Sequence, residues 1–118
     1  MADARTVAGR AGEDAALAAY TRRGYRLIAR NWRCRIGELD LVLVRGDTLV
    51  FCEVKTRRGA RFGGGYEAVT GRKRAKVRAV AEAFLQASGA RPRAIRFDVA
   101  SVALRPAGVE VELFEDAF

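Results

Sequence analysis

The sequence predicts an α/β protein in which a mixed central sheet of about five strands is flanked by helices, in the chain order α-β-β-β-α-β-β. Three observations predict this class. Two apolar runs separated by a short polar turn are typical of a β-hairpin. Two long segments have the apolar spacing and the terminal glycines of helices, and two further apolar runs follow the second of them. Because the hairpin strands are apolar on both faces, we expect them inside the sheet, with a helix on each side.

The first helix is predicted from residue 3 or 6 to residue 23, and Gly24 is a typical stop signal. Gly9 and Gly12 each lower the helix propensity by about 1 kcal/mol relative to alanine. Their presence indicates that something approaches this first turn of the helix closely. A short strand over residues 25–29 is predicted to follow.

The hairpin is predicted from residues 39–44 and 49–54, with Gly46 and Asp47 in the turn. A loop of two or four residues gives paired positions that add to 93, so Val42 faces Phe51 across the hairpin. This register fixes which side chains share a face of the sheet.

The same register has an unusual consequence at the open end of the hairpin. Continued outward, it places Asp40 opposite Glu53 and Glu38 opposite Lys55. Like charges directly opposite each other destabilise a sheet. Two facing carboxylates need a partner, and a divalent cation is the natural one.

The second helix is predicted over residues 70–88, with Thr70 as the N-cap and Gly89 just past the end. Residues 95–104 and 109–114 read as the last two strands, joined by a turn that contains proline and glycine. The chain of 118 residues is long enough for one core and too short for two, so we expect a single domain over residues 1–118.

Composition excludes several classes of site. The chain has no histidine, which excludes histidine-based triads and zinc sites that need imidazole. A metal must therefore be held by oxygen atoms, which favours Mg²⁺ or Mn²⁺. No apolar run approaches the ~20 residues of a membrane span, and the N-terminus lacks a signal-peptide pattern. With two cysteines and no C-x-x-C pair, we expect a cytoplasmic protein without a disulfide.

The charge distribution points towards a polyanionic partner. The net charge is +8, and the last 22 residues carry five acids against one arginine, so the first 96 residues carry +12. A basic region beside an acidic site suits a nucleic-acid backbone. The alternative is an ordinary solvated surface. The expected nucleic-acid contacts are Arg57, Arg58, Arg61, Arg72, Lys73 and Lys76.

The spacing at the open end of the hairpin suits phosphodiester hydrolysis. Residues i and i+2 of a strand share a face, so Lys55 projects with Glu53 and, through the register, with Asp40. The two carboxylates, with the Val54 carbonyl as a third donor, are the candidate ligands of a divalent cation that polarises the scissile phosphate. The Lys55 amine then stabilises or deprotonates the attacking water. The alternative is that Lys55 pairs with Glu38 in a salt bridge.

Glu13 is a further candidate. It follows Gly12 and shares a helical face with Leu17 and Tyr20, at i+4 and i+7. An acid on the inward face of a helix suggests a functional role. A solvent-facing helix acid is the alternative.

Several segments resemble the YraN family of small endonuclease-like proteins: GRAGEDAA, RNWRCRIGELDLV, LVFCEVKTR, EAVTGRKRAKV and RFDVASV. The resemblance covers nearly the whole chain, and the GELDLV…VFCEVKTR block is its most specific part. That family is similar to the Holliday-junction-resolvase branch of the PD-(D/E)xK nucleases. The resemblance therefore implies a restriction-endonuclease-like core, branched or structured DNA as substrate, and a homodimer.

By position, Asp40, Glu53 and Lys55 match the catalytic motif of that superfamily. Glu13 matches the additional first-helix acid of the resolvase-like branch, which implies a role in metal coordination or positioning. One departure is that Glu38-Leu39 stands where the superfamily often has a proline before the aspartate. The carboxylate pair remains intact.

Together, the residues and the resemblance favour a Mg²⁺-dependent endonuclease that acts on DNA. The alternative is a non-catalytic nucleic-acid-binding module with the same fold. A protein-interaction domain whose carboxylates are structural is a third hypothesis.

Overall fold

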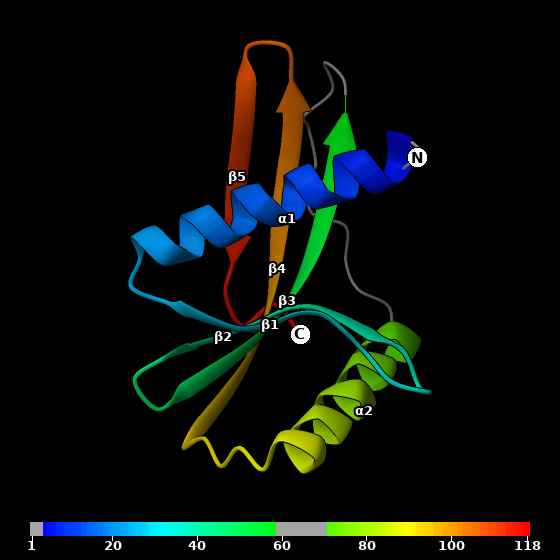
Figure 1. The fold of residues 1–118 in the computed structure, drawn as a ribbon, viewed down its shortest axis with the longest axis vertical. Helices are drawn as coiled ribbons and strands as arrows, with labels where there is room; N and C mark the ends of the chain where they lie inside the picture. Colours follow the sequence, from blue (N-terminus) through cyan, green and yellow to red (C-terminus); the bar gives the residue numbers. More distant parts are fainter. Residues whose placement is uncertain (1–3, 59–70) are drawn as a thin grey trace.

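The computed structural model describes residues 4–58 and 71–118, and shows an α/β fold with one mixed five-stranded sheet (Figure 1). The strands lie in the order β1-β2-β3-β4-β5; β3 and β4 are parallel, and the other neighbours are antiparallel. The predicted fold class and the order α-β-β-β-α-β-β are confirmed. The elements are α1 (Ala4–Arg22), β1 (Arg26–Arg33), β2 (Glu38–Arg45), β3 (Thr48–Arg58), α2 (Gly71–Ser88), β4 (Ala94–Arg105) and β5 (Gly108–Phe114).

Each helix packs against a different set of strand side chains, as expected for strands that are apolar on both faces. The first buried cluster lies beside α2 and the second beside α1. The α2 cluster includes Leu39, Val42, Leu49, Phe51, Val77, Val80, Phe84, Phe97 and Val99. The α1 cluster includes Ala16, Tyr20, Leu41, Leu43, Val50, Cys52, Ala100 and Val102.

The hairpin has the predicted turn and register. Gly46 and Asp47 form the two-residue turn, and Gly46 has φ of 60°, a conformation that glycine adopts without strain. Val42 pairs with Phe51, as predicted from positions that add to 93. The predicted helix ends are also confirmed, since Gly24 and Gly89 have φ of 88° and 71° just past α1 and α2. The predicted N-cap, Thr70, lies outside the described residues.

Two strands extend beyond their predicted ends. β1 continues to Arg33 because it pairs with β2 along its length, with a register shift between Leu27 and Ala29. β3 continues to Arg58 because it pairs in parallel with β4 as far as Leu104. Backbone pairing satisfies the amide and carbonyl groups whatever side chain a residue carries. The extra residues of these strands are mostly polar, so no apolar pattern in the sequence indicated that the strands continue.

The close approach predicted at the first helix occurs at Gly12. A Cβ atom built on Gly12 would lie 1.9 Å from the Thr56 Oγ1 atom, whereas one on Gly9 would meet nothing within 4 Å. Gly12 therefore lets α1 lie directly on β3, one residue beyond Lys55. This contact brings Glu13, the next residue of α1, towards the open end of the hairpin.

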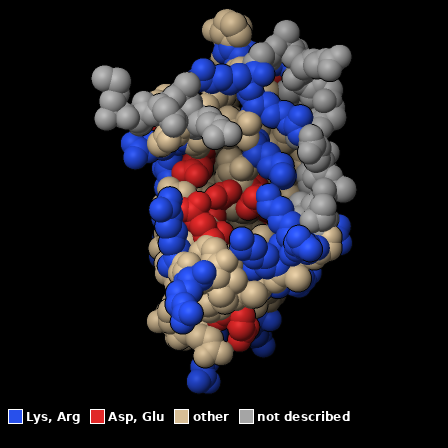
Figure 2. Space-filling model, turned by 90° about the vertical axis from the view of Figure 1, so that its right-hand side faces the viewer, with Lys and Arg blue, Asp and Glu red and all other residues tan. Residues whose placement is uncertain are grey.

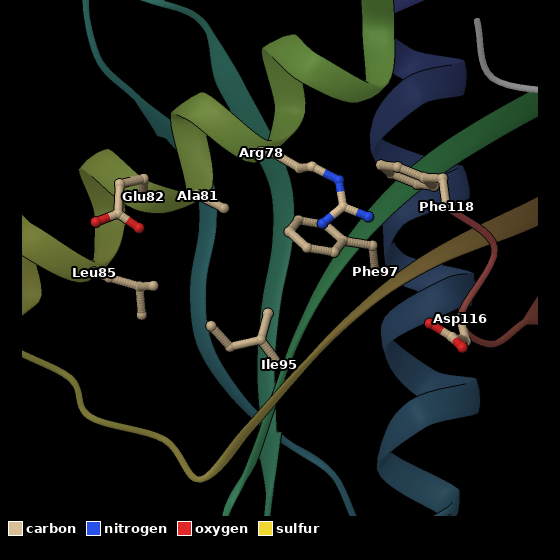
Figure 3. A pocket seen from close by; sticks show the side chains of 8 residues that line it. All are labelled: Arg78, Ala81, Glu82, Leu85, Ile95, Phe97, Asp116 and Phe118. Carbon is tan, nitrogen blue, oxygen red and sulfur yellow. The ribbon is translucent and has the colours of Figure 1, made fainter. Parts of the chain in front are cut away.

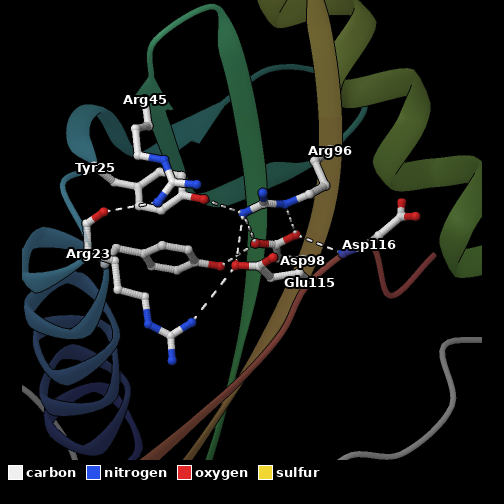
Figure 4. A network of polar contacts seen from close by, with 8 residues as sticks. Arg23, Tyr25, Arg45, Arg96, Asp98, Glu115 and Asp116 are labelled. Atoms are coloured by element: carbon white, nitrogen blue, oxygen red, sulfur yellow. Dashed lines mark hydrogen bonds and ion pairs between the residues drawn. The ribbon is translucent and has the colours of Figure 1, made fainter.

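A buried ionic network on β4 fixes the C-terminal segment against α1 (Figure 4). Asp98 is fully buried and binds the Arg96 guanidinium through both oxygens, at 2.8 and 2.9 Å. The Tyr20 hydroxyl donates to the same carboxylate at 2.7 Å, and the Asp116 amide donates at 3.0 Å. Asp98 is thus a structural ion-pair residue that joins β4, α1 and the C-terminal segment.

Candidate functional site

The hairpin ladder ends just before the predicted acidic pair. Leu41 and Cys52 are its last partners, so the predicted backbone pairing of Asp40 with Glu53, and of Glu38 with Lys55, is wrong. Instead, the Val54 amide donates to the Asp40 Oδ2 atom at 2.8 Å. In a continued ladder the Val54 amide would donate to a backbone carbonyl of β2. Here the Asp40 carboxylate takes the place of that carbonyl.

The alternation of β2 also breaks at Asp40. Leu39 belongs to the cluster beside α2, whereas Leu41 belongs to the cluster beside α1, although residues i and i+2 of a regular strand share a face. The neighbouring strand has a matching irregularity. Asn31, between the β1 partners of Leu39 and Leu41, has φ of 53°, which asparagine tolerates better than most residues. The two strands are distorted together where the acid lies.

The carboxylates still interact through their charges. The pKa of Asp40 is raised from 3.8 to about 7, chiefly by burial and next by the negative charge of Glu53. The hydrogen bond from the Val54 amide acts in the opposite direction, while the charges of Glu13 and Glu38 add smaller increases. The structure thus brings Asp40 and Glu53 into one acidic group, as the sequence predicts, by a different local geometry.

Glu53 has a basic partner, Lys73, that was not predicted for it from the sequence. The Lys73 ammonium lies 2.8 Å from the Glu53 Oε1 atom, with side chains 42% and 19% exposed. The pKa of Lys73 is raised, chiefly by its hydrogen bond to Glu53. Lys73 was predicted to contact nucleic acid; in this structure it neutralises one carboxylate of the acidic group.

Lys55 is half-buried on β3 and pairs across the sheet with Ser101. The alternative salt bridge to Glu38 is not formed, because the Glu38 carboxylate accepts from the Arg33 guanidinium on β1. Lys55 instead lies near Lys73, the partner of Glu53. Both lysines therefore belong to the same group of side chains as Glu53.

Glu13 is held against β1 and does not face solvent. Its Oε1 atom accepts from Arg30 Nε at 3.1 Å, and its Oε2 atom accepts from Asn31 Nδ2 at 3.0 Å. The side chain is 13% exposed. Neither Arg30 nor Asn31 was among the residues predicted for the site. Their polar character within a strand was the available signal, and their partner was not deducible from spacing.

The donor set suits a hard divalent cation. Asp40, Glu53 and the Val54 carbonyl offer oxygen atoms, and Mg²⁺ is commonly held by one or two carboxylates with waters and substrate phosphates. No three acidic or cysteine side chains within residues 4–58 and 71–118 are arranged to enclose a metal by themselves. The residues therefore fit an open magnesium or manganese site better than a closed protein cage.

Acidic and basic side chains gather on one face of the molecule. Figure 2 shows acidic side chains on the floor of a hollow that is rimmed by lysine and arginine. Among the predicted nucleic-acid contacts, Arg57 is half-buried, and Arg58, Arg72 and Lys76 are exposed. Arg61 lies outside the described residues. A rim of positive charge around an acidic centre is compatible with a bound phosphate backbone.

Another cavity, of about 350 Å³, lies between α2 and the C-terminal segment (Figure 3). Its wall includes Phe97, Phe118 and Arg78, whose guanidinium lies 4.7 Å from the centre of the Phe97 ring. None of the predicted site residues that the structure describes lines it, and neither Asp40 nor Glu53 is part of its wall.

The fold and this group of side chains define an α/β protein with a carboxylate–lysine site at the open end of the hairpin, where the ladder between β2 and β3 has ended. The chain belongs to the uncharacterised protein family UPF0102, whose profile matches residues 12–102. This is the YraN family that the sequence motifs resemble.

Three relatives show the extent of the similarity. A UPF0102 protein of Parafrankia sp. is 51% identical over 111 residues, which cover 93% of this chain and 94% of the relative. A UPF0102 protein of Frankia alni is 49% identical over 116 residues, covering 98% and 97%. A third, of Pelotomaculum thermopropionicum, is 44% identical over 120 residues and covers 100% of both chains. No described helix is long and apolar enough to cross a membrane.

Proposed function

We propose that this chain is a metal-dependent endonuclease that hydrolyses phosphodiester bonds in DNA. The observation that carries the proposal is the proximity of Asp40 and Glu53 at the open end of the hairpin, where the charge of Glu53 raises the pKa of Asp40. Lys55 lies two residues beyond Glu53, and the hollow is rimmed by positive charge (Figure 2). Paired carboxylates with an amine nearby supply the groups that metal-assisted hydrolysis requires.

Asp40 and Glu53 would hold Mg²⁺ or Mn²⁺, with the Val54 carbonyl as a further donor. When bound, the ion supplies Lewis-acid polarisation of the scissile phosphate. The Val54 amide fixes the orientation of the Asp40 carboxylate through the 2.8 Å hydrogen bond. Hydrogen bonds of this kind reduce the cost of ordering a ligand before the metal arrives.

Lys55 acts on the attacking water. Its amine either stabilises the negative charge that develops on the water oxygen or accepts the water proton. Glu13 acts by positioning, because both of its oxygen atoms are engaged by Arg30 and Asn31. Those bonds fix the distorted segment of β1 that lies beside Asp40.

The exposed Arg58, Arg72 and Lys76, with Arg57, bind the phosphate backbone of the substrate. Such contacts position a nucleic acid without reading its sequence. The resemblance to resolvase-like nucleases favours branched or structured DNA, and a homodimer would place two such sites on two strands.

The test is cleavage of duplex, single-stranded and junction DNA, and of structured RNA, in Mg²⁺ or Mn²⁺. We expect cleavage that EDTA abolishes and that Asp40→Asn and Lys55→Met each reduce by at least about 100-fold. Asp47→Asn, which changes an exposed acid in the hairpin turn, should retain full cleavage. Failure of the wild-type chain to cut any of these substrates would refute the enzyme proposal.

A second candidate is a nucleic-acid-binding module without catalysis. One observation favours it: Lys73 already neutralises Glu53, so the acidic group has a counter-ion without metal. This function predicts saturable binding that neither EDTA nor Asp40→Asn weakens, without cleavage. Under the endonuclease proposal, binding to an uncleaved junction should strengthen when Ca²⁺ is added.

A further inference from the structure

The ion pair between Lys73 and Glu53 joins two elements that the sequence separates. Glu53 lies on β3 and Lys73 lies in the first turn of α2, yet the ammonium and carboxylate are 2.8 Å apart. The Glu53 side chain is 19% exposed, so its charge is partly removed from water. A carboxylate in that position needs a counter-charge.

Lys73 is in an unfavourable place for a purely structural lysine. The first turn of α2 contains no acid, and cations near a helix N-terminus oppose the helix dipole. The Glu53 carboxylate offsets this repulsion. If a divalent cation replaced the ammonium on Glu53, the lysine would need another anion, and a phosphate of a bound nucleic acid would supply it.

We propose that Lys73 is a tethered counter-ion, which holds Glu53 in the metal-free protein and leaves that carboxylate when a divalent cation binds. This inference rests on the proposed metal site. Lysine suits the role because its ammonium is a compact charge on a flexible four-carbon stem, so it can move between two anions. Metal binding and nucleic-acid binding are then linked, since the metal releases a cation that can reach the substrate.

The proposal makes two opposite predictions for a variant that lacks the ammonium. Removing the competing cation should strengthen metal binding, because Glu53 no longer has to exchange one partner for another. Removing the released cation should weaken nucleic-acid binding in the presence of metal, because one phosphate contact is lost. A lysine that only stabilises the fold would not produce the second change, because its removal would alter nucleic-acid affinity equally with and without metal.

The experiment is calorimetric titration of the full chain with Mn²⁺ alone, for the wild type, Lys73→Gln, Lys73→Arg and Arg91→Gln. Arg91 is exposed and follows the C-terminal end of α2, whereas Lys73 lies in the first turn, so Arg91→Gln removes a positive charge at the opposite end of the helix. We expect Lys73→Gln to bind Mn²⁺ at least about tenfold more tightly, which corresponds to about 1.4 kcal/mol. Lys73→Arg keeps a cation at this position, so its affinity should be closer to that of the wild type, and Arg91→Gln should change it less than about twofold. Urea denaturation identifies the folded variants.

Binding of a short uncleavable DNA duplex in Ca²⁺ is the second measurement. Lys73→Gln should bind the duplex more weakly than the wild type in Ca²⁺. In EDTA the two should bind it equally, because the wild-type Lys73 then stays ion-paired with Glu53 and contacts no phosphate. Equal or weaker Mn²⁺ binding by a folded Lys73→Gln chain overturns the tethered counter-ion and leaves the proposed endonuclease intact. If neither the wild type nor Lys73→Gln binds Mn²⁺, the metal site fails, and both proposals are overturned together.

Discussion

Replacing Asp40 by asparagine should stabilise the metal-free protein at neutral and alkaline pH. The asparagine side-chain oxygen can still accept the 2.8 Å hydrogen bond from the Val54 amide. The substitution removes a negative charge that is buried and lies near the charges of Glu53, Glu13 and Glu38. Functional sites commonly carry such unfavourable charges, and their removal stabilises the fold at the expense of activity.

The magnitude follows from the pKa of Asp40, which rises from 3.8 to about 7 in the folded chain. Each pKa unit corresponds to about 1.36 kcal/mol, so ionising this carboxyl group in the folded chain costs at most about 4 kcal/mol. Partial solvent access reduces the net cost of ionising Asp40, and so does Lys73, which is ion-paired with Glu53. We therefore expect Asp40→Asn to raise the free energy of unfolding by about 1 to 3 kcal/mol at pH 8.

The gain should depend on pH in a defined direction. The folded chain binds the Asp40 proton more tightly than the unfolded chain, so the wild type loses stability as the pH rises from about 4 to about 7. At pH 4 the group is protonated in the folded chain, and the advantage of Asp40→Asn should nearly vanish. The contribution of the other carboxylates is common to both proteins and cancels in the difference.

The assay is urea denaturation of the wild type, Asp40→Asn and Asp47→Asn at pH 4, 6 and 8 in EDTA. Asp47→Asn, in the exposed hairpin turn, controls for the loss of one acid from the surface. At pH 8, adding Mg²⁺ should stabilise the wild type more than Asp40→Asn, because the ion binds the folded chain through the ionised carboxylate. An Asp40→Asn chain that is no more stable than the wild type at pH 8, or whose advantage is independent of pH, would refute the reasoning.

Gly12→Ala should destabilise the fold by about 1 to 3 kcal/mol, because its methyl group would lie 1.9 Å from the Thr56 Oγ1 atom. Gly9→Ala, in the same helix and with nothing within 4 Å of the added methyl, should be neutral or stabilising by up to about 1 kcal/mol; equal urea midpoints for the two variants would contradict this difference. Asp98→Ala should cost about 3 to 5 kcal/mol, because it leaves the Arg96 guanidinium without its bidentate partner, and a loss below about 1 kcal/mol by the same assay would show that the network is dispensable. For the intact chain, fluorescence anisotropy should show that the logarithm of the nucleic-acid association constant falls linearly with the logarithm of the salt concentration. The slope should be about −0.9 for each duplex phosphate contacted, and an affinity independent of salt would exclude backbone binding.

The sequence determined the fold class and the hairpin register, for reasons that are local. Apolar runs of strand length, helical spacing and glycines at turns are properties of neighbouring residues. A two-residue turn at Gly46 and Asp47 fixes every pair that follows until the strands separate. The helix glycines are a partial example, since the close contact they predict occurs at Gly12, against Thr56, but not at Gly9, where nothing lies within 4 Å.

The tertiary structure decided how the predicted acids meet and which charges accompany them. The ladder ends at Leu41 and Cys52, because the Val54 amide bonds to the Asp40 side chain. Periodicity cannot reveal such an exchange, since a side chain that replaces a backbone acceptor leaves no repeat in the sequence. The pairing of Lys73 with Glu53 was equally hidden, because it depends on how α2 packs against the sheet. The sequence alone supplied the chemical groups of the candidate site, and the packing of helices on the sheet determined their partners, because ion pairs form between residues that are neighbours only in the folded chain.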